Sequence, residues 1–350
     1  MKNYSFFSKL LHKQFLSKGE LTNLFINKIL SKAYNLQSDE SSNIFITGLA
    51  RAGTTALLES LDSTNKFASF RYKYMPFILS PKLSYFYSRY LNNADTKKVE
   101  RMHADGLEIG PNSPECLDEP FWIHTIYKNH GFDNRLQPHS IKTNILNSYA
   151  YLLNSFSSIE KKSGMIVKNN NSHLRILSLA GFFKNSKFLI VFRSPIAHAK
   201  SLLSLHKRLI KIQKDDGYVL EYMNLLGHWE FGKGVKPFIY NEKQDDIYSY
   251  KNTSINYWLK QWIYTYEWIL EIHTKNNLGN LRLVCYEDLC NDDNYKSNLF
   301  ESILINPNEI SFNYRIGKSN KDNSSYDIDK KDIDYANYIY NILRENSLNQ

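Results

Sequence analysis

The sequence predicts an α/β fold, a three-layer sandwich in which helices cover both faces of a central parallel sheet. Two observations lead to this prediction. Residues 43–47, 187–192 and 281–286 are almost continuously apolar, which is typical of strands buried on both faces of a parallel sheet. Segments with the apolar periodicity of helices lie between these runs, and strands that alternate with helices favour a parallel arrangement.

The N-terminal segment, residues 1–40, is expected to form an amphipathic helix. Basic side chains break its apolar runs, so none approaches the roughly 18 residues of a membrane span or the apolar core of a signal peptide. Two arrangements of this helix are open: it packs onto its own domain, or it makes peripheral contact with a membrane surface. Because no linker and no repeat divides the remainder, residues 41–350 are expected to form one domain.

Within that domain, the periodicity of apolar residues predicts helices over 54–61, 173–183, 196–212 and 255–273. Trp258, Trp262 and Tyr266 lie four residues apart in the last of these and are expected to form a core stripe. Residues 213–251 are polar and contain several glycines, which predicts a mixed helical and irregular insertion over the site. Residues 317–334 are expected to form a polar loop that is either mobile or ordered by a ligand.

The charge of the chain indicates an anionic partner. Lys and Arg number 44 against 35 Asp and Glu, and the formal net charge of +9 suits an anionic ligand, an acidic polymer or an anionic membrane surface. No nucleic-acid-binding motif and no block of basic residues occurs, so nucleic acid is not the expected partner. The three cysteines, Cys116, Cys285 and Cys290, lack metal-binding spacing, which favours a reducing, cytoplasmic compartment.

A glycine-containing loop follows the first predicted strand and opens a helix. It reads Gly-Leu-Ala-Arg-Ala-Gly-Thr-Thr over residues 48–55. In this context backbone N–H groups and the positive end of the helix dipole face a phosphate. The glycine spacing resembles a Walker A loop, but Thr54 stands where a nucleoside triphosphatase has lysine, which argues against ATP or GTP as the reacting ligand. An ordinary strand-to-helix turn with a threonine cap is the alternative.

A second phosphate site is predicted after the run 187–192. Arg193 follows that strand directly, and Ser201 lies about two turns into the next helix. A guanidinium and a hydroxyl so placed can converge on one phosphate, whereas Arg193 alone would be a surface ion pair. Two phosphate sites on one sheet indicate a nucleotide that is phosphorylated at two positions. Glu287 and Asp288, after the third strand, are expected to cap a helix.

Taken together, these segments resemble the sulfotransferases that use 3′-phosphoadenosine 5′-phosphosulfate (PAPS), over residues 43–289. Further stretches resemble a bacterial sulfotransferase group: residues 103–115, 168–171 and 226–232. The resemblance implies a P-loop-like loop that binds the 5′-phosphosulfate through Arg51, Ala52, Gly53, Thr54 and Thr55. It implies that Arg193 and Ser201 bind the 3′-phosphate, and that no metal takes part. The implied reaction moves a sulfuryl group to a hydroxyl or amine of a carbohydrate, lipid or small metabolite.

The same resemblance implies two basic catalytic residues. Transfer of a sulfuryl group needs positive charge beside the departing nucleotide oxygen and a base for the acceptor proton. Arg51 is assigned to that charge; many cytosolic members carry lysine there, and the tyrosylprotein type carries arginine. Lys168 lies near the position of a lysine that serves the sulfonate in the tyrosylprotein type, and a surface lysine in an asparagine-rich turn is its alternative reading.

Four residues are candidates for the base, in the order Glu119, Glu115, His103 and His228. The two glutamates are spaced to share one face of a helix, which Pro120 is expected to limit. The histidines have pKa values that are ordinarily close to neutrality. Each of the four has a structural role as its alternative.

Two other functions stay open at this point. The chain could be a non-catalytic basic protein that binds a nucleotide or another polyanion through a vestigial loop. A nucleotide kinase is the less favoured alternative, because Thr54 occupies the position of the Walker lysine.

Overall fold

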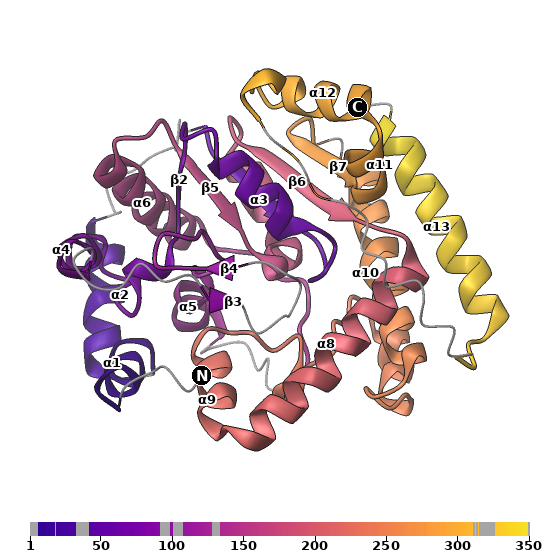
Figure 1. The fold of residues 1–350 in the computed structure, drawn as a ribbon, viewed down its shortest axis with the longest axis horizontal. Helices are drawn as coiled ribbons and strands as arrows, with labels where there is room; N and C mark the ends of the chain where they lie inside the picture. Colours follow the sequence, from indigo (N-terminus) through magenta and orange to yellow (C-terminus); the bar gives the residue numbers. More distant parts are fainter. Residues whose placement is uncertain are drawn as a thin grey trace.

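The computed structural model describes residues 6–17, 19–32, 42–91, 99–100, 108–127, 134–276, 278–310, 312, 314 and 326–348. Its centre is a five-stranded sheet in the order β2-β5-β1-β6-β7, and every neighbouring pair of strands in it is parallel (Figure 1). The strands are β1 (Ile44–Thr47), β2 (Ala68–Ser69), β5 (Met165–Lys168), β6 (Lys187–Phe192) and β7 (Leu281–Cys285). The predicted α/β class with a central parallel sheet is confirmed.

All three predicted strands are present, and β1 lies in the middle of the sheet. It pairs with β5 on one side and with β6 on the other, and all of its residues are buried. The third run ends one residue early because Tyr286 begins the next helix. The sequence does not predict β2 or β5, since β2 has two residues and β5 ends in Lys168, which is buried only through its place in the sheet.

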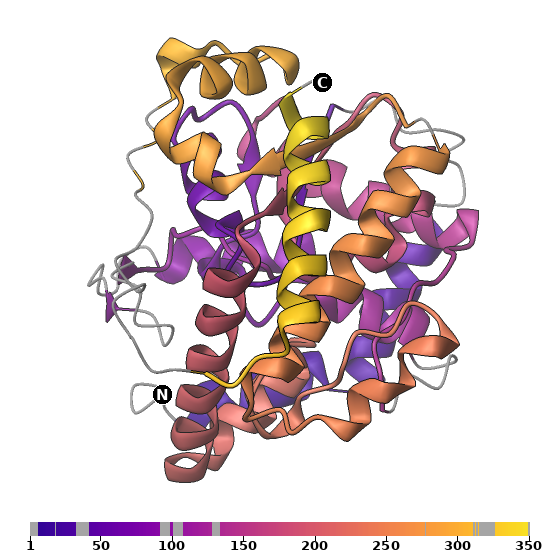
Figure 2. The ribbon, with the colours of Figure 1, turned by 90° about the vertical axis from the view of Figure 1, so that its right-hand side faces the viewer.

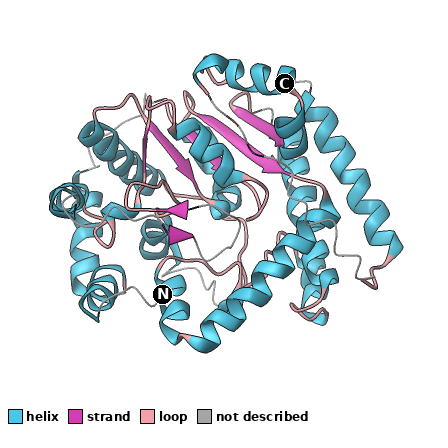
Figure 3. Ribbon diagram, viewed as in Figure 1, coloured by secondary structure: helices cyan, strands magenta, loops and turns pink. Residues whose placement is uncertain are grey.

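Helices cover both faces of this sheet. The chain crosses from β1 to the edge strand β2 through α3 (Thr54–Asp62) and returns to β5 through α6 (Thr143–Glu160). Right-handed crossovers that run in opposite directions put their helices on opposite faces, and both helices pack against β5. Figure 3 shows the strands enclosed between the helices. The sheet is then completed through helices α7 (Ile176–Phe182), α8 (Pro195–Asp215), α9 (Gly217–Leu225) and α10 (Ile255–Asn276).

Three of the four predicted helices match α3, α8 and α10 closely. The fourth differs at its start, because a 3₁₀ helix, Asn170–Arg175, precedes α7. In α10 the predicted core stripe is confirmed: Trp258, Trp262 and Tyr266 are all buried.

The remaining elements surround this centre. Before α6 lie α4 (Pro81–Leu91), the hairpin of β3 (Val99–Glu100) with β4 (Glu108–Ile109), and α5 (Glu119–Trp122), which continues as the π-helix Ile123–Tyr127. After β7 come α11 (Tyr286–Asn291), α12 (Asp293–Ser302) and α13 (Lys330–Leu348). Helix α13 packs against β7 and α10, and Figure 2 shows it crossing the face of the molecule. Short 3₁₀ helices occur at Tyr72–Tyr74, Gly232–Gly234, Glu242–Ser249 and Pro307–Glu309.

The N-terminal segment is helical, as expected, but it forms two helices instead of one, α1 (Phe6–Leu16) and α2 (Glu20–Lys32). Both pack onto the domain, because α1 contacts α9 and α2 contacts α6. The imidazole Nε2 of His124 also donates to the carbonyl oxygen of Leu16, at 2.9 Å. None of the described helices is both long and apolar enough to cross a membrane. Residues 33–40 of the predicted segment lie outside the described residues.

The insertion after α8 is more helical than its composition indicates. Helix α9 forms because the side chain of Asp216 accepts a hydrogen bond from the N–H of Tyr218 and so caps the helix. Two of the 3₁₀ helices follow in the same segment, at Gly232–Gly234 and Glu242–Ser249. In the predicted polar loop 317–334, the last residues belong to α13, which begins at Lys330, and residues 317–325 lie outside the described residues.

We predict that Gly48→Ala destabilises the protein by roughly 2 kcal/mol or more, measured as the free energy of unfolding in urea. Gly48 has a φ of 128°, and a Cβ there would lie 2.2 Å from the carbonyl oxygen of Val191 in β6. The obstacle is backbone of a central strand, which cannot move aside without loss of sheet pairing.

Gly181→Ala is the matched control. Gly181 lies in α7, and an added Cβ would have no neighbour within 4 Å, so alanine there is expected to stabilise the helix by about 0.5–1 kcal/mol. Equal stabilities of the two variants would contradict the close approach of the loop to β6.

Candidate active site

The loop between β1 and α3 adopts backbone conformations that favour glycine. Gly48, Arg51 and Gly53 have φ values of 128°, 71° and 103°. A non-glycine residue with positive φ is strained, and such residues cluster at functional sites. At Gly53, a Cβ would lie 2.1 Å from the ring of Tyr286, so a glycine is required where the loop meets that ring. Gly53 then caps α3, whose first N–H groups have no partner within the helix and can bind an anion.

Arg193 and Ser201 lie against this loop. Nη1 of Arg193 donates to the carbonyl oxygen of Arg51 at 3.4 Å, and Nε of Arg51 donates to Oγ of Ser201 at 3.3 Å. The two elements that the sequence singles out therefore meet at the carboxyl edge of the neighbouring strands β1 and β6, where open α/β sheets bind their ligands. Nε of Arg193 is buried and has no hydrogen-bond partner among the described residues. This donor and the glycine-lined loop fit an anionic ligand.

Helix α8 is tied to the loop by a histidine that the sequence analysis does not single out. Nε2 of His198 donates to the carbonyl oxygen of Ala50 at 2.8 Å. Burial, with the nearby charge of Arg193, lowers the pKa of His198 to about 3. The imidazole is therefore neutral near pH 7, and the hydrogen bond to Ala50 fixes its tautomer.

The expected capping role of Glu287 and Asp288 is wrong in detail. Oε1 of Glu287 accepts from the N–H of Ser194 at 3.0 Å, so this carboxylate satisfies the start of α8 instead of its own helix. Asp288 binds the guanidinium of Arg344 in α13 through both carboxylate oxygens. The two carboxylates thus connect α11 to α8 and α13.

Lys168 ends β5, beside the loop. Its Nζ lies 3.0 Å from Oε1 of Glu115, and the two side chains are 6% and 10% exposed. Glu115 is held in turn by the N–H of Cys116, at 2.9 Å from Oε1, and by the hydroxyl of Tyr72, at 3.3 Å from Oε2. The structure therefore brings together a lysine and a glutamate that lie 53 positions apart in the sequence.

The turn after β5 connects this pair to the loop. The hydroxyl of Thr54 donates to Oδ1 of Asn170 at 3.4 Å, and the hydroxyl of Thr47 donates to the carbonyl oxygen of the same residue at 3.3 Å. Asn170 therefore joins the end of β1 to the start of α3. Thr54 is buried and Thr55 is half-buried at the start of that helix.

Glu119 occupies a different environment from Glu115. Its side chain is 1% exposed and is paired with the guanidinium of Arg175, which is fully buried. Asn169 donates to Oε2 of Glu119 at 2.7 Å, and the hydroxyl of Tyr127 donates to Oε1 at 2.9 Å. Burial alone would raise the pKa of Glu119, but Arg175 and these hydrogen bonds bring the pKa below its usual range. Its carboxylate is fully engaged inside the protein.

The expectation that Glu115 and Glu119 share one face of a helix is wrong. Helix α5 begins at Glu119, and Pro120 is its second residue, where a missing N–H costs nothing; proline starts this helix and does not limit it. Glu115 lies in the irregular segment before it. Of the two histidine candidates, His103 lies outside the described residues.

His228 lies in the insertion, where its imidazole Nδ1 is 3.8 Å from Oε2 of Glu230. His228 is 27% exposed and Glu230 only 6%. Burial raises the pKa of Glu230, with the charge of His228 opposing that rise. The charges of Glu119 and Lys168 also act on Glu230, so the insertion brings a further carboxyl group into the electrostatic field of the site.

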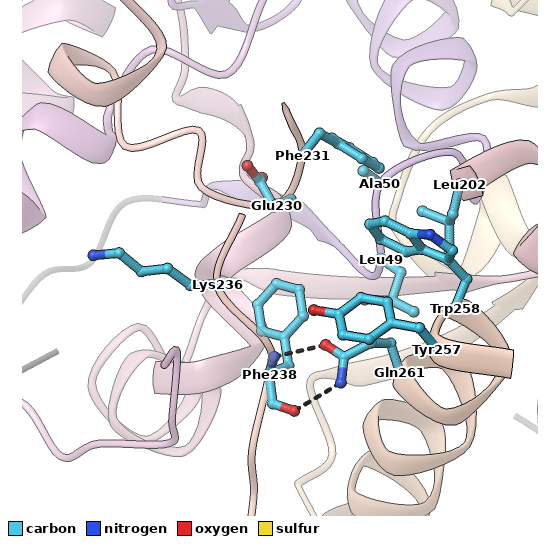
Figure 4. Close-up of a pocket in the computed structure, with 10 residues that line it drawn as sticks. All are labelled: Leu49, Ala50, Leu202, Glu230, Phe231, Lys236, Phe238, Tyr257, Trp258 and Gln261. Carbon is cyan, nitrogen blue, oxygen red and sulfur yellow. Dashed lines mark hydrogen bonds between the residues drawn. The ribbon is translucent and has the colours of Figure 1, made fainter. Parts of the chain in front are cut away.

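A small pocket lies between the loop and the insertion (Figure 4). Leu49 and Ala50 of the loop form one wall, and Leu202, next to Ser201, continues it. Gln261 fixes the opposite wall by accepting from the N–H of Phe238 at 2.6 Å and donating to its carbonyl oxygen at 3.1 Å. The other lining residues are mostly aromatic: Glu230, Phe231, Lys236, Tyr257 and Trp258. No group of three or more metal-ligating side chains occurs in the described part of the chain.

Several residues of this site carry no signal in the sequence. Tyr286 lies over Gly53 and near the guanidinium of Arg193, 5.7 Å from its ring centre. Arg175 looks like any polar residue of a helix, although it is fully buried. The pairing of the buried Lys168 with Glu115 also needs the fold. The role of Arg175 becomes visible only when its partner, Glu119, is known.

No family model matches the chain, and no curated protein matches it. Among solved structures, it is similar to the sulfotransferase STF1 from Mycobacterium tuberculosis H37Rv, with 10% identity and a TM-score of 0.48 over 81% of this chain and 73% of that one. It is similar to the sulfotransferase STF9 from Mycobacterium avium, with 11% identity and a TM-score of 0.44 over 84% and 71% of the two chains. A third is the sulfotransferase domain of the Synechococcus PCC 7002 olefin synthase, with 12% identity and a TM-score of 0.36 over 82% and 83%. Because all three TM-scores lie below 0.5, the function is inferred from this chain's own residues.

We predict that Arg175→Met destabilises the protein by about 3–5 kcal/mol, because it leaves the carboxylate of Glu119 buried without its counter-charge. The double variant Arg175→Met with Glu119→Gln should recover part of that loss, since no buried charge is left unpaired. The measurement is the free energy of urea unfolding.

Lys275→Met serves as the control, because Lys275 forms an exposed ion pair with Glu271 on α10 and its loss should change stability by about 0.5 kcal/mol or less. If Arg175→Met were no more destabilising than Lys275→Met, the structural assignment of Glu119 would be wrong.

Proposed function

We propose that this chain is a PAPS-dependent sulfotransferase of the bacterial type, which transfers the sulfuryl group to a hydroxyl, or an amine, of a carbohydrate, lipid or small metabolite. The observation that carries the proposal is the contact of two anion-binding elements at one edge of the sheet: the loop that contains Arg51, and Arg193 with Ser201. A nucleotide with phosphate groups at both its 5′ and 3′ positions needs two such elements. A kinase is disfavoured by Thr54 at the Walker lysine position.

In this proposal the loop binds the 5′-phosphosulfate. The N–H groups at the start of α3, with Ala52, Gly53, Thr54 and Thr55, supply donors and the positive end of the helix dipole. Arg193 and Ser201 bind the 3′-phosphate, and Nε of Arg193 supports this role because it is a buried donor with no hydrogen-bond partner in the described part of the chain. When the ligand binds, the guanidinium of Arg193 and the hydroxyl of Ser201 would leave their present contacts with the loop and bind the phosphate instead.

Arg51 and Lys168 are proposed as the residues that stabilise the departing nucleotide. Negative charge grows on the bridging oxygen as the bond from sulfur to oxygen breaks, and two cations beside it lower the energy of that transition state. The position of Lys168 at the end of β5, in the strand next to β1, supports this assignment. The acceptor oxygen forms the new bond to sulfur, and the nucleotide leaves as adenosine 3′,5′-bisphosphate.

We assign the base to Glu115 ahead of Glu119. Glu115 retains 10% exposure and lies 3.0 Å from Lys168, so its carboxylate is close to the assigned cation and can take the acceptor proton. Glu119 is better explained as a structural residue. It is the buried partner of Arg175, and it holds the turn after β5 by accepting a hydrogen bond from Asn169. His228 beside Glu230 is the second candidate.

The proposal includes a cytoplasmic location. All three cysteines are free thiols, as expected in a reducing compartment.

The donor assignment is tested by calorimetry with two nucleotides. We expect adenosine 3′,5′-bisphosphate to bind much more tightly than AMP, and Arg193→Ala to remove most of that difference, since a lost charge-assisted contact weakens binding by roughly tenfold or more. Arg282→Ala is the control, because Arg282 binds backbone carbonyl groups at the opposite end of β7 and should leave both affinities unchanged. Equal affinity of the wild-type protein for the two nucleotides would refute PAPS as the donor.

The catalytic assignment is tested by kinetics once an acceptor is found with a panel of glycans, lipids and phenols. Lys168→Met and Glu115→Gln should each lower kcat by roughly a hundredfold or more, with a smaller effect on donor affinity. Glu271→Gln, which alters an exposed ion pair on α10, should leave kcat unchanged. A Glu115→Gln enzyme with normal kcat would move the base to His228.

A further inference from the structure

Helix α8 carries a row of basic side chains on its outer face. Lys207, Arg208, Lys211 and Lys214 are all exposed, and we refer to these four residues as the basic stripe. Their spacing places them on one side of the helix, together with the exposed Ser204 and the half-buried Lys200. These cations form no continuous block in the sequence: Lys207 and Arg208 are adjacent, and two other residues precede each of Lys211 and Lys214. Only the helix brings them together.

The basic stripe is not neutralised by the residues that the structure describes. None of its four residues forms an ion pair with another residue in the described part of the chain. Asp215, at the last position, is the single acidic residue of α8. On the adjoining helix α9, Glu221 is already paired with Lys13, at 3.0 Å. Four uncompensated cations along one face create a positive potential that attracts an anionic partner.

The position of the basic stripe links it to the proposed donor site. Helix α8 starts at the carboxyl edge of the sheet, where Ser201 contacts Arg51, and runs outward to α9 at the periphery of the molecule (Figure 1). Lys200 lies next to Ser201, and Lys214 lies 14 positions further on, which corresponds to about 21 Å along the helix. A linear anionic molecule that lies along this face therefore has one end at the donor site.

The chemistry of the outer face selects among anionic partners. None of the exposed large hydrophobic side chains in the described residues lies on α8, so nothing there can insert into a membrane. No Phe, Tyr or Trp occurs in α8, and its two histidines, His198 and His206, are buried, so it offers no surface on which nucleic-acid bases could stack. What it offers is charge without apolar contact, which suits a hydrated polymer that carries both carboxylate and hydroxyl groups.

We propose that the basic stripe binds the acceptor, and that this acceptor is an acidic polysaccharide whose chain extends from the donor site along α8. The role of this polymer as the sulfuryl acceptor rests on the proposed function, whereas its binding to the basic stripe does not. Long-range attraction by the stripe would concentrate the polymer near the site, and the hydroxyl groups would make it a substrate. Each transferred sulfonate adds a negative charge, so partly modified chains would bind more tightly than unmodified ones.

The test uses the full chain and a fluorescently end-labelled alginate oligosaccharide, with neutral dextran as the uncharged polymer. Binding is measured by anisotropy at low and at physiological ionic strength. The wild-type protein should bind alginate and not dextran, and higher salt should weaken that binding. The variant Lys207→Ala, Arg208→Ala, Lys211→Ala, Lys214→Ala should bind alginate roughly tenfold or more weakly, since several exposed charge contacts are lost together.

The control removes the same number of charges elsewhere: Lys28→Ala, Lys32→Ala, Lys330→Ala, Lys331→Ala, all exposed residues of α2 and α13. It should bind alginate like the wild type. Equal weakening in the control variant, or stronger binding of dextran than of alginate, would overturn the proposal. Tighter binding of single-stranded oligothymidylate or of phosphatidylglycerol vesicles than of alginate would overturn it as well, in favour of nucleic acid or a membrane.

Binding of adenosine 3′,5′-bisphosphate by the same variants separates this inference from the proposed function. The stripe variant should keep its nucleotide affinity, because its four residues do not contact the loop. If the wild type binds alginate through the stripe but binds no bisphosphate, the polymer surface stands and the donor assignment fails. If it binds the bisphosphate but not alginate, the donor assignment stands and the polymer surface fails.

Discussion

The parallel pairing of β1 with β6 is the constraint on which the candidate site depends. Because the two strands run in the same direction in neighbouring positions, the segments that follow them emerge at one edge of the sheet. Gly48 then approaches the carbonyl of Val191 so closely that no side chain fits, and Arg51 is turned into a left-handed conformation. From that position its backbone meets Arg193 and its side chain meets Ser201. Both proposed phosphate-binding elements follow from this one pairing.

A buried ion pair supports the other half of the site. Glu119 and Arg175 lie away from water, and their charges compensate each other with help from Asn169 and Tyr127. Asn169 follows β5 directly, so the pair positions the turn that also carries Asn170 and its contact with Thr54. Lys168 is the last residue of the same strand and faces a second glutamate, Glu115, that keeps some exposure. Burial therefore separates the two carboxylates: Glu119 is enclosed beside Arg175, whereas Glu115, the proposed base, keeps some exposure.

Helix α8 combines two electrostatic roles along its length. Its start lies at the sheet edge, where His198 and Glu287 tie it to the loop and Ser201 meets Arg51. Its outer face carries the basic stripe, and its inner face packs against α10. Part of the net positive charge of the chain thus lies beside the proposed donor site, in a position where it can act on the proposed acceptor. Packing on one side and charge on the other are what an amphipathic helix provides.

Local signals in the sequence determined the parallel sheet, three of its strands, and the residues that follow β1 and β6. These features can be recognised locally, because a continuous apolar run, or a glycine loop before a helix, involves only residues that are neighbours in the chain. The tertiary structure alone decided which carboxylates meet which cations. Glu115 and Lys168 are 53 positions apart, and Glu119 and Arg175 are 56 apart, so no periodicity or spacing encodes these pairs. The tertiary structure also corrected the expected role of Pro120, which lies at the start of α5 and does not limit that helix. An ion pair between distant residues exists only after folding has placed both charges at one point and removed the water between them, and a sequence contains neither the distance nor the burial.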